Sequence, residues 1–397
     1  MDLKPTTRIQ HRYQLHDQAC LRCPQRLPYT AATLAVQQSH VRGYGSDDRR
    51  HPRRSSITFL RNCIMDITIC LAAIIAFSIL MYIALDGFDL GIGILFPFFP
   101  GNDDRNRMMS SVAPVWDGNE TWMVLGSAAL YAVFPMVYSV VLPAIYVPLL
   151  VMVLCLILRG VAFEIRSKAR RTRRLWDLAF IGGSTGATLC QGIVLGTWLF
   201  GIPIADGQFA GHAFDWFNPL SLFTGLALLV TYALLGCCWM IAKTDGDLQR
   251  RLYRIVLPLT ALQVLTIVAV TLWTPLLAHM FATRWSDSSA LTWLVPVPLL
   301  VVVCTWAMHD AVHARHNIAP FLLALGFVLL GYVGLLVSIW PYAILPGVTI
   351  WQAAAPRSSQ TFTLVGALII VPVILGYTIL NYRLFRGTTN HEELHYH

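Results

Sequence analysis

Nine runs of mostly apolar residues dominate this sequence, and each is about as long as a helix that crosses the hydrocarbon core of a bilayer. Because lipid offers no partner for an unpaired backbone group, and because the runs lack the strict alternation of barrel strands, we expect each run to be a helix. The chain is therefore predicted to be an all-α polytopic membrane protein. The predicted spans are 67–85, 121–138, 141–163, 178–200, 219–242, 255–277, 291–308, 319–340 and 361–382.

The balance of charge agrees with a membrane protein and predicts its orientation. Only 13% of the residues are charged, against about a quarter in soluble domains. Outside residues 1–64, nearly all Lys and Arg fall in the loops after spans one, three, five and seven and in the C-terminal tail, whereas the opposite loops hold only Arg284 and Arg357. The positive-inside rule makes the first set cytoplasmic and places the start of the first span in the periplasm. The basic residues therefore indicate membrane orientation, and we expect no nucleic-acid partner.

Residues 1–64 do not fit this orientation. They contain eleven of the 29 Lys and Arg residues and only four acidic residues. The predicted orientation would therefore put a strongly basic segment on the outer side of the membrane. Met65 is followed at once by Asp66 and a clean apolar run. We expect residues 1–64 to be a disordered or spurious extension and residues 65–397 to form the membrane domain.

The first polar motif, LDGFDLGIG at 85–93, places two carboxylates beside a membrane span. Asp86 and Asp89 are three residues apart and therefore share one helix face. The motif is open to two interpretations. It is either the charged end of a span followed by a glycine-rich break, or part of a proton or ion path, because an ionisable group within a membrane is costly.

The second motif, APVWDGNETW at 113–122, starts the second predicted span. Asp117 and Glu120 are again three residues apart, and Trp116 and Trp122 flank them. Helix capping accounts for one acidic residue, and an interfacial aromatic belt accounts for the tryptophans. Neither explanation accounts for the whole motif.

The third motif, LRGVAFEIR at 158–166, ends the third predicted span. Arg159 lies within the span, and Glu164 and Arg166 follow one to two turns later. Because the first three spans bring charge to the same leaflet, Arg159 can neutralise an aspartate of the first two motifs. The alternative is that Arg159 extends to the membrane surface.

Two further motifs are compatible with metal binding. His309, His313 and His316 have helical spacing, and Cys20 and Cys23 form a single CxxC pair. Histidines at a cytoplasmic helix end commonly only decorate the interface, and one CxxC without a second pair is weak evidence for zinc. We therefore predict no metal site.

Three segments together carry a resemblance to a known family. They are DGFDLGIGILFPF at 86–98, MSSVAPVWDGNETW at 109–122 and RGVAFEIR at 159–166. In this order and spacing they closely resemble subunit II of cytochrome bd-type quinol oxidases, particularly the cyanide-insensitive branch. The resemblance runs from Met65 to near the C-terminus.

The resemblance implies a fold, a partner and a reaction. It implies nine transmembrane helices, arranged as two four-helix bundles plus one peripheral helix, in the bacterial inner membrane. It implies a heterodimer with a homologous subunit I, which ligates haems b558, b595 and d and oxidises ubiquinol or another quinol; a small third subunit is a further possible partner. The complex reduces oxygen to water with cytoplasmic protons and generates proton motive force, and the isolated chain is expected to be inactive. Histidine is scarce within the spans, which agrees with haem ligation by subunit I.

The resemblance also implies roles for single residues. Asp86 and Asp117 match positions assigned to a proton pathway, and Trp122 matches a position near an oxygen entry route in some members. Glu120 stands where other members have glutamine. The charges expected to support the pathway are Asp89, Glu120, Arg159 and Glu164.

Two other functions remain open from the residues alone. Membrane carboxylates paired with an arginine also suit a proton-coupled secondary transporter, although no second copy of DGFD or WDGN occurs in the later spans. A purely structural subunit, whose charges only position its partner, is the third interpretation.

Overall fold

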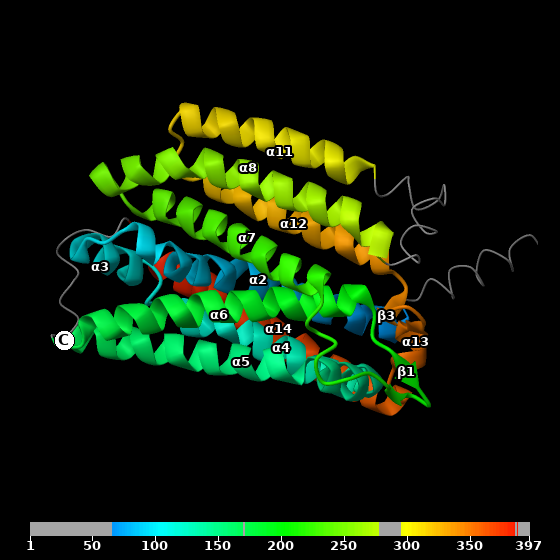
Figure 1. The fold of residues 1–397 in the computed structure, drawn as a ribbon. Helices are drawn as coiled ribbons and strands as arrows, with labels where there is room; N and C mark the ends of the chain where they lie inside the picture. Colours follow the sequence, from blue (N-terminus) through cyan, green and yellow to red (C-terminus); the bar gives the residue numbers. More distant parts are fainter. Residues whose placement is uncertain (1–65, 170, 278–294, 386, 388–397) are drawn as a thin grey trace, which may run out of the picture. The chain divides into compact units, whose positions relative to one another are not determined.

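The computed structural model describes residues 66–169, 171–277, 295–385 and 387. The predictions for residues 1–64, including the Cys20–Cys23 pair, lie outside these residues. Within them, long helices predominate and run side by side (Figure 1). The long helices are α2 (Ile67–Leu95), α4 (Trp116–Val133), α5 (Pro135–Lys168), α6 (Arg173–Phe200), α7 (Pro219–Lys243), α8 (Gly246–Leu277), α11 (Pro296–His313), α12 (Ala319–Ile339) and α14 (Arg357–Leu384).

Each predicted span overlaps at least one of these helices, so the all-helical prediction is confirmed. Within the described residues, eight of the helices are long and apolar enough to cross a membrane. The exception is α4, which has 18 residues and carries Asp117 and Glu120 in its first two turns. Of the nine predicted transmembrane helices, eight are therefore supported by length and apolar composition.

Short elements connect the helices at two ends. One end, called the α3 end here, contains η1 (Phe96–Phe98) and α3 (Asn102–Ser110). The other, called the hairpin end, contains two antiparallel β-hairpins and a short helix (Figure 1). These elements are β1 (Ile204–Ala205), β2 (Gln208–Phe209), β3 (Tyr342–Ile344), β4 (Val348–Thr349) and α13 (Ile350–Ala353).

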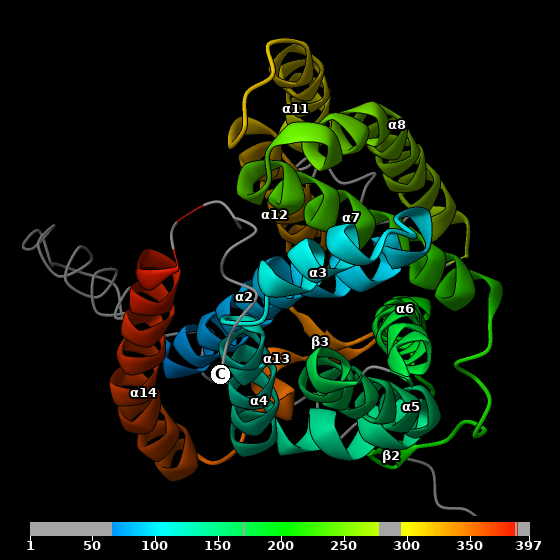
Figure 2. The ribbon, with the colours of Figure 1, turned by 90° about the vertical axis from the view of Figure 1, so that its left-hand side faces the viewer.

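The helices form two groups of four and one peripheral helix, as the family resemblance implied. Helices α2, α4, α5 and α6 pack together, and α7, α8, α11 and α12 form the second group (Figure 2). The two groups meet where α7 packs on α2 and α6. Helix α14 packs mainly on α4 and α2 and touches α7 near its C-terminal end, and its apolar surface is almost entirely exposed in the isolated chain, as lipid- or partner-facing surface would be.

Helix α2 continues without a break through the glycine-rich segment after Asp86, so the interpretation of this segment as a helix break is wrong. The glycines permit close packing instead. A Cβ on Gly91 would lie 1.9 Å from the Tyr232 carbonyl oxygen of α7, and one on Gly93 would lie 2.1 Å from the Ser184 hydroxyl of α6. The segment therefore joins α2 to its neighbours and keeps Asp86 within a regular helix.

The boundary between the second and third spans also differs from the prediction, in which the second span ends at residue 138 and the third begins at residue 141. Helix α4 ends at Val133 and α5 begins at Pro135, with Phe134 in a non-helical conformation between them. Proline lacks an N–H and disfavours helical geometry in the preceding residue, which explains a break at this position.

Candidate functional site

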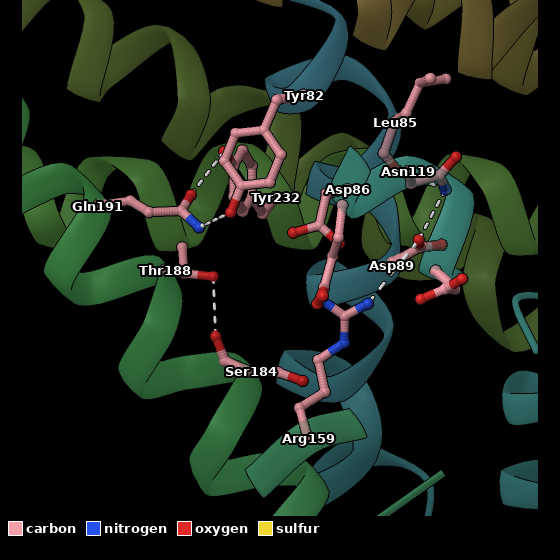
Figure 3. A network of polar contacts seen from close by, with 12 residues as sticks. Tyr82, Leu85, Asp86, Asp89, Asn119, Arg159, Ser184, Thr188, Gln191 and Tyr232 are labelled. Carbon is pink, nitrogen blue, oxygen red and sulfur yellow. Dashed lines mark hydrogen bonds and ion pairs between the residues drawn. The ribbon is translucent and has the colours of Figure 1, made fainter. Parts of the chain in front are cut away.

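Four charged side chains meet inside the first helix group, and we call them the Arg159 cluster: Asp86, Asp89, Glu120 and Arg159. The Arg159 guanidinium is completely buried, and its Nη1 lies 2.8 Å from Asp86 Oδ1 and 3.2 Å from Glu120 Oε1. Its Nη2 lies 4.0 Å from Asp89 Oδ2. Figure 3 shows Asp86 and Asp89 converging on Arg159. The prediction that Arg159 neutralises an aspartate is confirmed, and the alternative of extension to the surface is wrong.

Aromatic rings exclude solvent from the guanidinium. Trp116 of α4 and Phe163 of α5 stack with their ring centroids 5.3 Å apart, and the guanidinium carbon of Arg159 lies 5.8 and 5.7 Å from the two ring centroids. An aromatic face attracts a cation electrostatically. The first tryptophan of the second motif, Trp116, therefore covers the buried charge as well as marking the start of α4.

Both aspartates have one bonded and one unbonded oxygen. Asp86 Oδ1 accepts from Arg159 at 2.8 Å, and Asp89 Oδ2 accepts from the Asn119 amide at 2.7 Å. Asp86 Oδ2 and Asp89 Oδ1 are buried and have no hydrogen-bond partner among the described residues. A buried carboxylate oxygen without a donor is costly when charged, but it can carry a proton.

Asn119 connects the cluster to the peripheral helix. Its Nδ2 donates to Asp89 and, at 3.4 Å, to the backbone oxygen of Leu85, while its Oδ1 accepts from the Tyr382 hydroxyl of α14 at 3.0 Å. Asn119 belongs to the second motif, but the sequence pattern gave it no role. Sequence reasoning missed Tyr382, because a tyrosine near a helix end resembles an ordinary interfacial residue.

A second group of hydrogen bonds lies beside Asp86 (Figure 3). The Gln191 amide of α6 donates to the Tyr82 hydroxyl of α2 at 2.5 Å and accepts from the Tyr232 hydroxyl of α7 at 2.9 Å. Tyr82 is one turn before Asp86 on the same face. The sequence contains a signal for this group, because Gln191 is an amide within the predicted span 178–200, but no pattern indicated its partners.

Asp117 lies outside the cluster, on the exposed face of the first turn of α4. It does not cap the helix, because the N-cap is Val115 and no side chain bonds the free backbone N–H groups there. Trp122 is completely buried, and its ring meets Phe77 edge-on at 5.7 Å. The roles in proton and oxygen movement that the resemblance assigned to Asp117 and Trp122 stay predictions.

Glu164 also lies outside the cluster, contrary to its expected supporting position. It follows Arg159 by five residues and is rotated about 140° around the helix, onto the exposed face. Arg166 follows by seven residues and returns to within about 20° of Arg159. Arg166 is accordingly buried, and it pairs with Asp177 of α6.

Arg166 belongs to a second ionic group, at the α3 end, that sequence reasoning missed. Asp177 also accepts from Arg105 of α3 at 2.8 Å. The Asn106 side-chain oxygen accepts from Arg166 at 3.0 Å and from Arg173. These contacts bind α3, α5 and α6 together, and they involve three of the basic residues, Arg105, Arg166 and Arg173, that the sequence analysis used only as a sign of orientation.

The histidines at the end of α11 form no metal site in the described part of the chain. The rings of His309 and His313 lie 4.1 Å apart between centroids, and both side chains are exposed. Among the described residues, no group of three or more His, Cys, Asp or Glu side chains could hold a metal ion.

Comparisons with known proteins give a consistent result. Cytochrome bd ubiquinol oxidase subunit 2 of Bacillus subtilis (strain 168) is 27% identical over 321 residues, which cover 78% of this chain and 93% of the relative. Cytochrome bd-I ubiquinol oxidase subunit 2 of Escherichia coli (strain K12) is 26% identical over 356 residues, which cover 78% of this chain and 91% of the relative.

The fold has a solved counterpart in the bd oxidase from Geobacillus thermodenitrificans, with a TM-score of 0.67 and 16% identity over 81% of this chain and 99% of the matched chain. The sequence profile described as "Cytochrome bd terminal oxidase subunit II" matches residues 67–385, a range that includes every residue of the Arg159 cluster. Because the profile spans most of its length, the chain belongs to the cytochrome bd terminal oxidase subunit II family.

Proposed function

We propose that this chain is subunit II of a terminal quinol oxidase in the bacterial inner membrane. It pairs with a haem-bearing subunit I that oxidises ubiquinol or another quinol and reduces oxygen to water. Membership of the family and the names of the Bacillus and Escherichia relatives support this proposal. In it, subunit II leads protons from the cytoplasm toward the site of oxygen reduction.

The observation that carries the proposal is the composition of the Arg159 cluster. Three carboxylates face one guanidinium inside a membrane helix group. One carboxylate would neutralise the guanidinium, so two of the acids are surplus. Intramembrane ionisable groups are costly and are commonly functional. A cluster that only joined helices would be served by one acid, whereas the surplus acids, with their unbonded oxygens, can take up and release protons.

Exposure decreases along the proposed route. Asp117 is exposed at the α3 end, Glu120 one turn later has a side chain that is 23% exposed, and the Asp86 side chain is 1% exposed. A proton taken up by Asp117 or Glu120 would pass to Asp86 Oδ2 and then to Asp89 Oδ1. Arg159 remains protonated throughout, because arginine does not deprotonate in proteins, and it stabilises whichever carboxylate is ionised.

The histidines in the described part of this chain do not fit a haem-ligating role. The histidines that the structure describes are all exposed: His212, His309, His313 and His316. An imidazole ligand facing a pocket within the helices is therefore not available in the described part of the chain. We assign haems b558, b595 and d to subunit I and derive the role of this chain only from its proton-carrying groups.

The test uses the purified complex. Reduced-minus-oxidised spectra and quinol-driven oxygen uptake are measured for the wild-type complex and for Asp86→Asn, which keeps shape but cannot carry a proton. We expect haem in both complexes and most of the turnover lost in the variant. A wild-type preparation without haem would favour the transporter, and an assembled Asp86→Asn complex with full turnover would favour the structural subunit.

A further inference from the structure

Helix α14 is linked to the Arg159 cluster through Tyr382, which bonds Asn119, the residue that donates to Asp89. The helix is peripheral and mostly exposed, yet Tyr382 in its last turn contacts both helix groups, Asn119 of α4 in the first and Trp239 of α7 in the second. The Tyr382 hydroxyl donates to Asn119 Oδ1 at 3.0 Å, and its ring meets Trp239 of α7 nearly perpendicularly, with 6.0 Å between centroids.

Several contacts hold this turn of α14 in place. Asn381 Nδ2 donates to the Pro114 backbone oxygen at 3.0 Å, and Lys243 Nζ donates to the Phe385 backbone oxygen at 2.7 Å. Gly118 of α4 gives the helix room, because a Cβ there would lie 3.0 Å from the Tyr377 ring. The Tyr382 contact is therefore one part of an organised junction.

The Tyr382 bond determines what Asn119 presents to Asp89. An amide has an acceptor at one end and donors at the other. With Oδ1 held by the phenol, Nδ2 faces Asp89 Oδ2 at 2.7 Å. The carbonyl oxygen of a carboxylic acid accepts an N–H bond better than its hydroxyl oxygen does, so this bond favours a proton on Oδ1, the oxygen that has no partner among the described residues. Without the phenol, the buried Oδ1 of Asn119 would lose its donor, and the amide could turn to accept from a protonated Asp89.

We propose that Tyr382 is a positioning residue of the proton route, which acts through Asn119 to keep the proton of Asp89 on Oδ1. The inference rests on the proposed function of the cluster. The inference also assigns a role to the peripheral helix α14, which packs little against the rest of the chain: α14 places the Tyr382 phenol at the junction of α4 and α7.

Tyr382→Phe is the direct test, because it removes the hydroxyl and keeps the ring against Trp239. In the purified complex we expect normal haem content, oxygen-uptake turnover about threefold to tenfold lower, as the loss of one buried hydrogen bond implies, and a displaced pH profile of turnover. Tyr377→Phe is the matched control. It alters the same helix, its side chain is exposed, and its hydroxyl makes no hydrogen bond within the described residues, so turnover and profile should not change.

Two further measurements separate positioning from general damage. In an Asn119→Leu background, Tyr382→Phe should cause no additional loss, because the two residues act in series. The infrared C=O band of protonated carboxylic acids that disappears in Asp89→Asn should shift in Tyr382→Phe and not in Tyr377→Phe.

The outcomes distinguish the two proposals. A Tyr382→Phe complex with the turnover, pH profile and infrared band of Tyr377→Phe would overturn the inference, even if Asp86→Asn abolishes turnover. If Asp86→Asn retains full turnover, the proposed function fails, and the infrared band still decides whether Tyr382 sets the protonation geometry of Asp89.

Discussion

Asp86 of α2 and Arg159 of α5 form a buried ion pair, with 2.8 Å between Oδ1 and Nη1 and almost no solvent exposure of either side chain. Asp86 lies roughly 28 Å along α2 from Ile67, which is comparable to the thickness of the hydrocarbon core. The pair therefore lies toward the α3 end, within reach of Glu120 in the first turns of α4. Burying these charges is tolerable only because they are buried together.

Arg159→Met should destabilise the chain strongly. The substitution fills a similar volume but leaves three carboxylates without their cation. Breaking a buried ion pair in this way costs about 3–5 kcal/mol. We expect loss of assembled complex, or a clearly lower thermal midpoint, measured by haem content and by thermal unfolding of the solubilised complex.

The compensated variant is the control for Arg159→Met. Asp86→Asn together with Arg159→Met removes one charge of each sign and should recover part of the lost stability, although not the turnover. An Arg159→Met complex as stable as the wild type would mean that the guanidinium is not what makes the buried acids tolerable.

Gly91→Ala tests the contact between the two helix groups. The added Cβ would meet the Tyr232 carbonyl oxygen at 1.9 Å, and backbone cannot yield as a flexible side chain can. Overpacking of this kind costs about 1–3 kcal/mol or more, so the thermal midpoint should fall. Gly182→Ala on α6 is the control, since nothing lies within 4 Å of its Cβ position, and there alanine should be neutral or slightly stabilising. Equal midpoints for the two variants would contradict the packing argument.

Much of this fold is predictable because its cause is local. Apolar length and the lack of backbone partners in lipid dictate helices wherever such runs occur. The errors arose where a neighbouring helix decided the outcome. Gly91 resembles a helix breaker in the sequence, but it lies in a regular helix because α7 needs the space.

The candidate site was predictable only in part, for a similar reason. Leaflet and charge indicated that Arg159 could pair with an aspartate of the first two motifs, but only the structure identifies that aspartate as Asp86. Proximity in sequence was misleading for Glu164, which lies on the opposite side of α5 from the cluster. The contacts of Gln191 and Tyr382 depend on which helices become neighbours, and no periodicity along the chain contains that information.

The start of α2 should show acid-sensitive stability. Asp66 accepts from the Thr68 backbone N–H at 3.1 Å and from the Trp351 indole at 2.6 Å, and these bonds lower the pKa of the carboxyl below its usual 3.8. Because the pKa is lower in the folded state, the stabilisation is complete above the unfolded pKa and is lost as the pH falls through the folded value.

Asp66→Asn isolates this effect, since asparagine also caps a helix but carries no charge. We expect a lower thermal midpoint than wild type at about pH 7 and a difference that shrinks below about pH 4. Trp351→Phe should reduce the same pH dependence by removing one donor. A wild-type advantage that persists unchanged into strong acid would show that the carboxylate charge is not involved.

Asp117→Asn addresses the entry of protons. The variant preserves the shape of the side chain, and the structure excludes loss of a cap as a complication, because Asp117 caps nothing. If Asp117 feeds Glu120, turnover of the assembled complex should fall while haem content and quinol affinity stay normal. The loss should be smaller than for Asp86→Asn, because Glu120 is itself partly exposed and can accept protons directly from solvent. The double variant should resemble Asp86→Asn alone, since losses at serial steps do not add.

Asp103→Asn, which removes an exposed carboxylate at the same end, is the control for surface charge and should leave turnover unchanged. A loss in Asp103→Asn equal to that in Asp117→Asn would assign the effect to the general negative charge of the α3 end and remove Asp117 from the route.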